Sequence, residues 1–87
     1  MNDKIQYYLD KLQEESAEII QAVSKIRRFG PDNHHPERKE TNKQEFIGEV
    51  EDFLALLAAL EYTNFIDLKK SDQNIIDKFK ILVDPKL

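Results

Sequence analysis

Eight consecutive residues near the middle of the chain, from Phe53 to Leu60, are all apolar. They extend a stripe with helical spacing, formed by Phe46, Val50, Phe53, Leu57 and Leu60. A helix that is apolar on every side is normally buried on every side. The chain has only 87 residues, and so small a domain has too little volume to enclose such a helix alone. The segment therefore predicts a subunit interface, with assembly into at least a homodimer.

The N-terminal third of the chain carries the pattern of one long helix over about residues 3–28. Apolar or small side chains recur there at alternating steps of four and three, at Ile5, Leu9, Leu12, Ser16, Ile19, Val23 and Ile26. This spacing is typical of an amphipathic helix packed along one seam. Asn2 or Asp3 can cap the first turn, and the Gly30-Pro31 pair predicts the end.

Residues 30–40 contain glycine, two prolines and no apolar side chain, which predicts a loop. A second helix is expected from the Thr41-Asn42 pair to about residue 64. Asn42 and Glu45, three residues apart, have the form of a capping box at its start. Gly48 lies inside this helix, where glycine costs about 1 kcal/mol, and indicates a close approach by another helix or a ligand.

A short third helix is predicted over about residues 72–83, capped by Ser71 and followed by Pro85. No segment alternates as a strand does. The expected fold is therefore all-α, in one domain over residues 1–87. It consists of a hairpin of two long helices plus a short C-terminal helix, and oligomerisation would complete a four-helix-bundle core.

Composition narrows the possible functions. The chain has no cysteine, which excludes disulfides and thiolate metal sites. Its net charge of −4 argues against binding a nucleic acid polymer. The longest apolar run is far shorter than a membrane helix requires, and the first residues lack a signal peptide's apolar stretch. We therefore expect a cytoplasmic protein with no membrane partner.

Two acidic pairs occupy equivalent positions on the two long helices. Glu15 and Glu18 lie beside the apolar seam of the first helix, and Glu49 and Asp52 lie at similar angular offsets on the second. When the helices pack, four carboxylates can converge, and such a cluster is unfavourable unless a cation lies among them. All-oxygen ligands select Mg²⁺, with Mn²⁺ as an alternative. Neither helix has the Glu-x-x-His pair of di-iron bundles.

A second interpretation of these acidic pairs competes with the metal site. Acidic pairs beside an apolar stripe are common on solvated helix faces, where nearby lysines form ordinary ion pairs. In that case the chain is a non-enzymatic helical dimerisation or regulatory module with a solvated acidic face. The adjacent residues His34 and His35 are best explained as loop residues, because no cysteine lies nearby and a proline follows them.

The sequence EESAE in the first helix, followed by EVED in the second, resembles the EExxE…ExxD signature of the MazG-like all-α nucleoside triphosphate pyrophosphohydrolases. The resemblance covers about residues 10–62. It implies Mg²⁺-dependent hydrolysis of (deoxy)nucleoside triphosphates at the α–β phosphoanhydride, giving a nucleoside monophosphate and pyrophosphate. It also implies assembly as dimers or dimers of dimers. The metal ligands that it implies are Glu15, Glu18, Glu49 and Asp52, and Glu14 would support the site or orient water.

Two basic residues at the end of the first helix are candidates for binding the substrate's phosphates. Lys25 lies seven residues after Glu18, on nearly the same side of the helix, and can reach a phosphate held by the metal. Arg28 is the second candidate. The competing explanation for both is a cationic helix C-terminus that interacts with the helix dipole. Phe29 is the best exposed candidate for stacking on a base.

Overall fold

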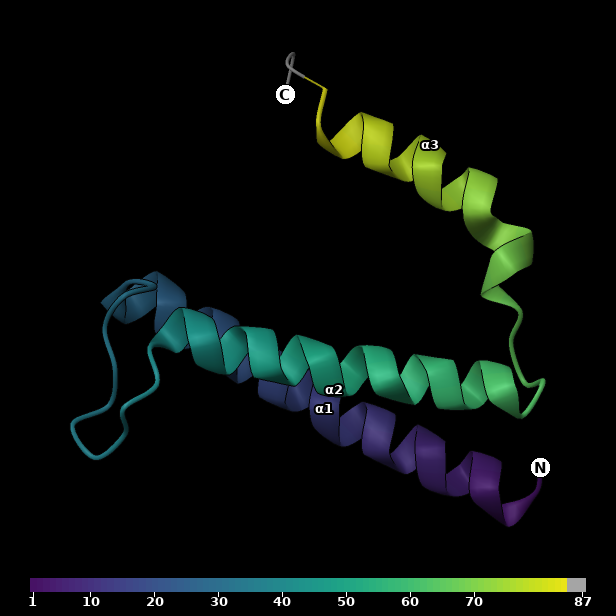
Figure 1. The fold of residues 1–87 in the computed structure, drawn as a ribbon, viewed down its shortest axis with the longest axis horizontal. Coiled ribbons are helices and arrows are strands. Elements are labelled where there is room, and N and C mark those ends of the chain that lie inside the picture. Colours follow the sequence, from purple (N-terminus) through teal and green to yellow (C-terminus); the bar gives the residue numbers. More distant parts are fainter. Residues whose placement is uncertain (85–87) are drawn as a thin grey trace.

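The computed structural model describes residues 1–84, and within them the chain is all-helical with no strand. Two long helices, α1 (Asp3–Phe29) and α2 (Asn42–Tyr62), pack against each other as an antiparallel hairpin (Figure 1). A 3₁₀ turn, η1 (Leu68–Ser71), leads into the short helix α3 (Asp72–Leu82). The predicted fold class is confirmed. No helix in this part of the chain combines the length and hydropathy needed to cross a bilayer.

Both ends of α1 follow from local sequence. The Asn2 side chain accepts a hydrogen bond from the Ile5 N–H at 2.8 Å, and so satisfies one of the free donors of the first turn. Gly30 ends the helix with a φ of 89°, in the left-handed region that glycine adopts without a Cβ penalty. The predicted boundaries of this helix are correct to within one residue.

The cap of α2 differs from the prediction by one residue. Thr41 is the N-cap: its hydroxyl accepts from the Gln44 N–H, and the Gln44 side chain accepts from the Thr41 N–H. The predicted capping box of Asn42 with Glu45 is therefore wrong. The Asn42 side chain is buried and donates to the Gly30 carbonyl at 3.0 Å, while Glu45 pairs with basic residues. Tertiary contacts use both side chains, so neither is free to cap.

The boundaries of the elements after the middle of α2 differ more from the prediction. Helix α2 ends at Tyr62, two residues early, and Asn64 follows with a left-handed φ of 62°. The turn η1 was not predicted. Ser71 does precede α3, but its side chain makes no capping hydrogen bond, because the chain enters α3 directly from the 3₁₀ turn. The predicted stop at Pro85 lies outside the described residues.

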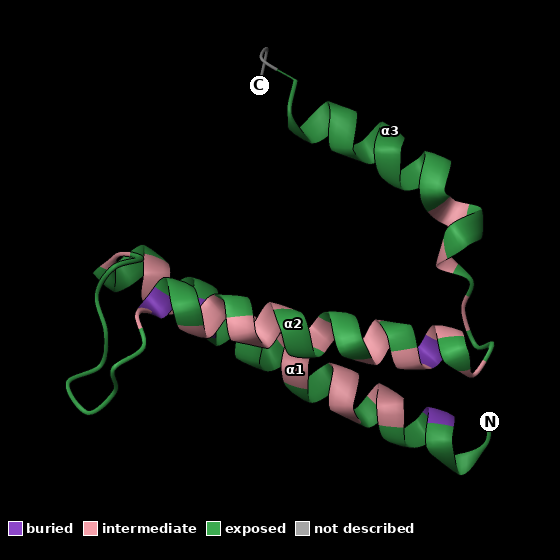
Figure 2. Cartoon of the chain, in the orientation of Figure 1, coloured by how far each residue is buried: buried purple, intermediate pink, exposed green. Residues whose placement is uncertain are grey.

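The core between α1 and α2 is thin. Among the described residues, only three hydrophobic side chains are buried: Ile5, Ala22 and Leu60 (Figure 2). On α1 the packed side is rotated from the predicted seam toward Ala22, which leaves Val23 38% exposed and Ile20 70% exposed. Part of the apolar side of α1 therefore does not face α2.

The chain is extended for its size. Its radius of gyration is 16.0 Å, whereas a compact domain of this length has about 12 Å. Its accessible surface is 7361 Å², against about 5,400 Å² for a compact monomer of this mass. Helix α3 lies away from the hairpin and all its residues are exposed (Figures 1 and 2). Large apolar side chains remain uncovered on α2 and α3, including Leu54, Ile75, Ile76, Phe79, Ile81 and Leu82.

The buried Asn42 generates a stability prediction. Its side chain joins the start of α2 to the end of α1, so Asn42→Ala leaves the Gly30 carbonyl without this partner. We expect a loss of about 1–3 kcal/mol in the free energy of unfolding, measured by urea denaturation at a fixed protein concentration. The exposed neighbour serves as the control, since Lys43→Ala should change stability by less than about 0.5 kcal/mol. Equal effects of the two substitutions would contradict the proposed role of Asn42.

Candidate metal centre

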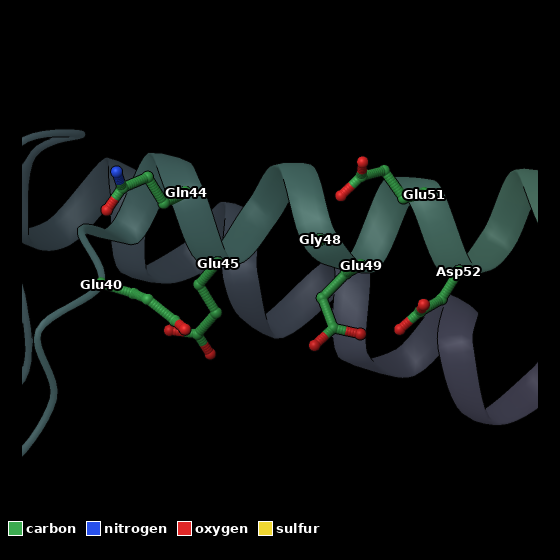
Figure 3. Close-up of a pocket in the computed structure, with 7 residues that line it drawn as sticks. All are labelled: Glu40, Gln44, Glu45, Gly48, Glu49, Glu51 and Asp52. Atoms are coloured by element: carbon green, nitrogen blue, oxygen red, sulfur yellow. The ribbon is translucent and has the colours of Figure 1, made fainter.

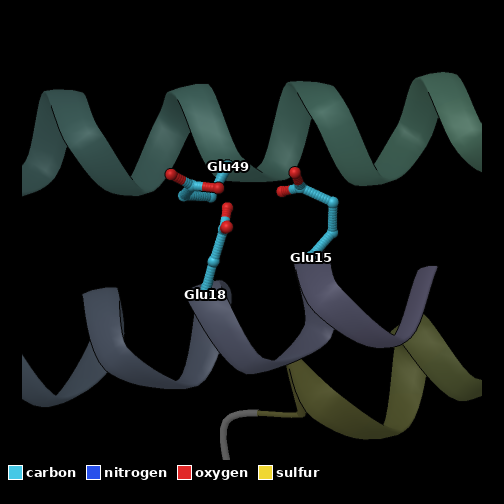
Figure 4. A group of neighbouring side chains, drawn as sticks. All are labelled: Glu15, Glu18 and Glu49. Atoms are coloured by element: carbon cyan, nitrogen blue, oxygen red, sulfur yellow. The ribbon is translucent and has the colours of Figure 1, made fainter. Parts of the chain in front are cut away.

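Three glutamates meet between the two long helices. Glu15 and Glu18 project from α1, and Glu49 projects toward them from α2 (Figure 4). One carboxylate oxygen of each lies within 4.8 Å of the others. Residues three apart share one side of a helix, so α1 presents its pair to the single glutamate of α2. We call these residues the acidic triad.

Two oxygen atoms of the acidic triad are buried without a partner. The Oε2 atoms of Glu15 and Glu49 are inaccessible to solvent, and no hydrogen bond reaches either of them. A buried carboxylate oxygen without a donor is costly, and two such oxygens beside a third carboxylate also repel one another. A cation among them would satisfy both oxygens and neutralise the repulsion. The all-oxygen donor set suits a hard divalent cation, so these residues fit Mg²⁺ or Mn²⁺.

The pKa shifts of two glutamates in the acidic triad also favour a positive charge among the carboxylates. The pKa of Glu18 is raised, chiefly because a protonated Glu18 can hydrogen-bond to Glu49 and because the two charges repel. For Glu49, hydrogen bonding with Glu18 lowers the pKa, but desolvation and the neighbouring Glu15 outweigh that effect and raise it overall. The cluster therefore favours a bound proton, or another positive charge, when it has no metal.

An open cavity of about 520 Å³ adjoins Glu49 (Figure 3). Most of its wall is acidic, and the lining residues are Glu40, Gln44, Glu45, Gly48, Glu49, Glu51 and Asp52. Asp52, the fourth ligand suggested by the sequence, lies in this wall outside the acidic triad. Its role as a ligand stays a prediction.

Gly48 opens onto this cavity. A Cβ added at this position would meet no atom within 4 Å. The predicted close approach by another helix is therefore wrong for the described chain, in which nothing packs on Gly48. The alternative prediction, that a ligand approaches the chain closely at Gly48, stays a prediction.

The remaining predicted site residues lie at the edges of the acidic triad. Glu14 is largely exposed and pairs with Lys11 at 3.3 Å, and this contact raises the pKa of Lys11. Lys25 does not extend freely into the site, because its Nζ donates to Glu45 at 2.9 Å. Arg28 is exposed, with its guanidinium carbon 5.2 Å from the centre of the Phe29 ring. Their functional roles remain predictions.

Sequence reasoning missed Glu45 and Arg38 as a connected group. Glu45 accepts from Lys25 and also from Arg38 at 3.1 Å. The Lys25 ammonium in particular holds the pKa of Glu45 below its usual value despite partial burial. Two cations on one carboxylate leave an excess positive charge beside the acidic cavity. Glu45 could have been identified from the sequence, since it lies one helical turn before Glu49. The contact of Arg38 with Glu45 could not, because it depends on the path of the loop.

The start of α2 offers no anion site. Its first amides are already used: Asn42 N–H donates to the Asn33 carbonyl, Lys43 N–H to the Pro31 carbonyl, and Gln44 N–H to the Thr41 hydroxyl. Helix N-termini bind phosphate only where such donors are free. Positive charge for an anionic ligand must therefore come from side chains or from a metal.

Comparison with known proteins found no matching family model, no similar curated protein and no similar solved structure. A functional assignment therefore depends on the acidic triad and its surroundings.

The raised pKa values give a test of the acidic triad that needs no substrate. Because the folded chain holds protons on Glu18 and Glu49 above their ordinary pKa of 4.5, it binds more protons than the unfolded chain does. Without divalent cations, the free energy of unfolding should fall as the pH rises from 4.5 through the raised values. Glu45 acts in the opposite sense and at lower pH, where its lowered pKa makes stability fall on acidification.

Urea denaturation across this pH range measures the slope. Glu18→Gln should flatten it, because the titrating group is removed. Glu51→Gln changes the charge of the same cavity outside the acidic triad and should leave the slope in place. Stability that rises with pH in this window, or a slope unaffected by Glu18→Gln, would contradict the proposed geometry.

Proposed function

We propose that this chain is a Mg²⁺-dependent nucleoside triphosphate pyrophosphohydrolase. It would hydrolyse (deoxy)nucleoside triphosphates at the α–β phosphoanhydride, and release a nucleoside monophosphate and pyrophosphate. The observation that carries the proposal is the acidic triad, with its two buried, unpartnered carboxylate oxygens between α1 and α2. The order of the acidic motifs, which resembles the MazG-like signature, supports it. We place the reaction in the cytoplasm, where nucleoside triphosphates and Mg²⁺ are abundant.

In this proposal Glu15, Glu18 and Glu49 would hold the metal ion, and Asp52 is the fourth candidate ligand. Bound Mg²⁺ supplies positive charge for phosphate oxygens and makes a nearby water more acidic. The cavity beside Glu49 has room for the substrate's phosphates, which its acidic wall would otherwise repel. The carboxylates thus account for the need for a divalent cation.

The remaining chemistry belongs to the chain's own side chains. Hydrolysis adds one water across the α–β anhydride bond, so a base must accept a proton from that water. Glu15 is the proposed base, because its Oε2 accepts no hydrogen bond and it adjoins Glu49, which lines the cavity. Glu14 would act only indirectly, by orienting water, since its carboxylate faces solvent and pairs with Lys11. Lys25 and Arg38, which both pair with Glu45, would supply positive charge for the phosphates together with Arg28.

Assembly is the second part of the proposal. The chain exposes about 2,000 Å² more than a compact monomer would, an amount per subunit that matches large obligate interfaces. We propose that a homodimer or homotetramer covers this surface, with the exposed side of α2 and helix α3 at the contact. Two hairpins packed in this way would form a four-helix core.

The exposed apolar surface also supports a second candidate function. A helical dimerisation or regulatory module would need that surface and would not need the acidic triad. The two candidates differ in one respect that can be measured, namely whether Mg²⁺ binds and pyrophosphate is released.

The metal-site test combines stability with turnover. Adding Mg²⁺ should stabilise the wild-type chain by about 2.7 kcal/mol when its concentration is 100 times the dissociation constant. Glu18→Gln and Glu49→Gln should lose this gain, and their pyrophosphate release should fall by about 100-fold or more. Without Mg²⁺, both variants should be as stable as the wild type or more so, because mutual repulsion is relieved.

Two matched variants serve as controls for this test. Glu51→Gln removes a cavity carboxylate outside the acidic triad and should keep the Mg²⁺ stabilisation. Glu14→Gln should keep the Mg²⁺ stabilisation, and any loss of its activity would identify a role in orienting water. If the wild type showed neither Mg²⁺ stabilisation nor pyrophosphate release from a nucleotide panel, the enzyme proposal would fail in favour of the helical module.

Assembly can be tested at a position that does not contribute to the hairpin core. Leu54 is 57% exposed, whereas Leu57 is half-buried, so Leu54→Asp places a charge in the proposed interface without disrupting the hairpin. We expect wild-type dimers or larger species in sedimentation velocity at micromolar concentration, and dissociation of the Leu54→Asp variant. Asn64→Asp adds the same charge in the loop after α2 and should not change the assembly. A folded wild-type monomer at that concentration would refute this part of the proposal.

A further inference from the structure

We propose that the loop joining α1 to α2 holds the base of the nucleotide. A second cavity, of about 200 Å³, lies at this end of the hairpin and is lined mainly by loop residues and the end of α1. Its lining includes Phe29, His34, His35 and Pro36, together with Lys25, Asn42 and Glu45. This inference rests on the proposed function, because the same nucleotide must reach the acidic triad. The volume suits one planar ring system rather than a drug-sized ligand.

The loop that forms this cavity is ordered by its own hydrogen bonds. The Asn33 side chain donates to the Phe29 carbonyl, and the Asn42 N–H donates to the Asn33 carbonyl at 2.7 Å. Further along, the Arg38 N–H donates to the His35 carbonyl at 2.9 Å. These contacts hold the loop backbone on both sides of the two histidines. The cavity is therefore formed before any ligand binds, which lowers the entropic cost of binding.

The two histidines are fixed in opposite tautomers. The Nδ1 of His34 lies 2.8 Å from the His35 carbonyl, which can only accept, so His34 carries its proton on Nδ1. The Nδ1 of His35 accepts from the Glu37 N–H at 3.1 Å, so a neutral His35 carries its proton on Nε2. In the neutral rings, His34 Nε2 is then an acceptor and His35 Nε2 a donor. One donor and one acceptor match the mixed donor–acceptor edge of a nucleobase.

Phe29 supplies the apolar part of this cavity. Its ring is about half exposed at the last residue of α1, and Pro36 lines the same cavity. Stacking of a base on an aromatic ring stabilises binding for any base, because every base has a π-face. The aromatic ring distinguishes a base from a phosphate or a sugar, because only the base has a π-face to stack on it.

The cavity is placed so that one nucleotide can occupy it and the acidic site together. Glu45 lines both this cavity and the acidic cavity beside Glu49. Along α1, Lys25 lies about 10 Å from Glu18, a separation that the sugar and first phosphate of an extended nucleotide can bridge. Lys25 and Arg38, both paired with Glu45, leave net positive charge between the two spaces. That charge favours the phosphates that connect them.

The first experiment needs no catalysis. The full-length chain, labelled with ¹⁵N, is titrated with each of the four common nucleoside 5′-monophosphates in the absence of Mg²⁺. We expect shift changes centred on Phe29, His34 and His35, and nuclear Overhauser effects between base protons and the Phe29 ring. Long-range ¹⁵N spectra of the histidine rings should show the proton on Nδ1 of His34 and on Nε2 of His35. Reversed tautomers would overturn the proposed recognition.

Variants separate the base from the phosphates. Phe29→Leu should weaken nucleotide binding about tenfold, while Phe29→Tyr should retain it. Phe65→Leu makes the same change in the loop beyond the other end of α2 and should have no effect. Binding of inorganic tripolyphosphate with Mg²⁺, which has no base, should be equal in wild type and Phe29→Leu.

The outcomes distinguish this inference from the proposed function. If Phe29→Leu binds nucleotides as tightly as wild type while Mg²⁺-dependent hydrolysis persists, the base site is wrong and the enzyme proposal stands. If monophosphates contact Phe29 but no nucleotide is hydrolysed, the base site stands and the enzyme proposal fails. If the loop signals depend on protein concentration and not on added nucleotide, a second copy of the chain occupies the cavity, and the inference is overturned.

Discussion

The register of the α1–α2 hairpin determines which side chains of the two long helices meet. In an antiparallel pair, each step toward the start of α1 is matched by a step toward the end of α2. The buried Asn42 side chain joins Gly30 at the closed end, and the Lys25–Glu45 pair follows within the next turn. Continuing in that direction brings Glu18 and Glu15 opposite Glu49. A slip of one residue at the loop would rotate Glu49 away from its two neighbours.

This register places two charged clusters along the same pair of helices, one in which cations accompany a carboxylate and one made of carboxylates alone. Near the loop, two cations share the Glu45 carboxylate, and the pKa of Glu45 is lowered. Further from the loop, the three carboxylates of the acidic triad face one another, and the pKa values of Glu18 and Glu49 are raised. The first cluster stabilises the hairpin, and the second destabilises it unless a positive charge is added. A site that costs stability when empty is typical of function, since packing alone would select apolar side chains there.

The sequence predicted the elements of the fold and most of the acidic cluster, because both depend on helical periodicity. Glu15, Glu18 and Glu49 were identified from their common phase beside the apolar seams. The capping box was missed by one residue because Thr41 with Gln44 and Asn42 with Glu45 fit the same pattern. Only the tertiary contact of Asn42 with Gly30 decides between them.

Other features could not be read from periodicity at all. The packed side of α1 includes Ala22 in place of Val23 because the helix faces α2 at an angle that the repeat does not specify. Arg38 reaches Glu45 only through the path of the loop. The tautomers of His34 and His35 likewise depend on backbone groups whose positions no spacing rule provides.

The exposed apolar surface and the acidic triad lie close together, because both belong to a thin hairpin of two helices. The Cα trace measures 15 Å along its shortest axis and 42 Å along its longest. In the proposed assembly, a partner that covered the apolar side of α2 would also remove water from the neighbourhood of the acidic triad. Repulsion among carboxylates strengthens as the surrounding dielectric constant falls. Assembly would thus increase the need for a cation in the acidic triad, and a bound cation would in turn favour assembly, because linkage acts equally in both directions.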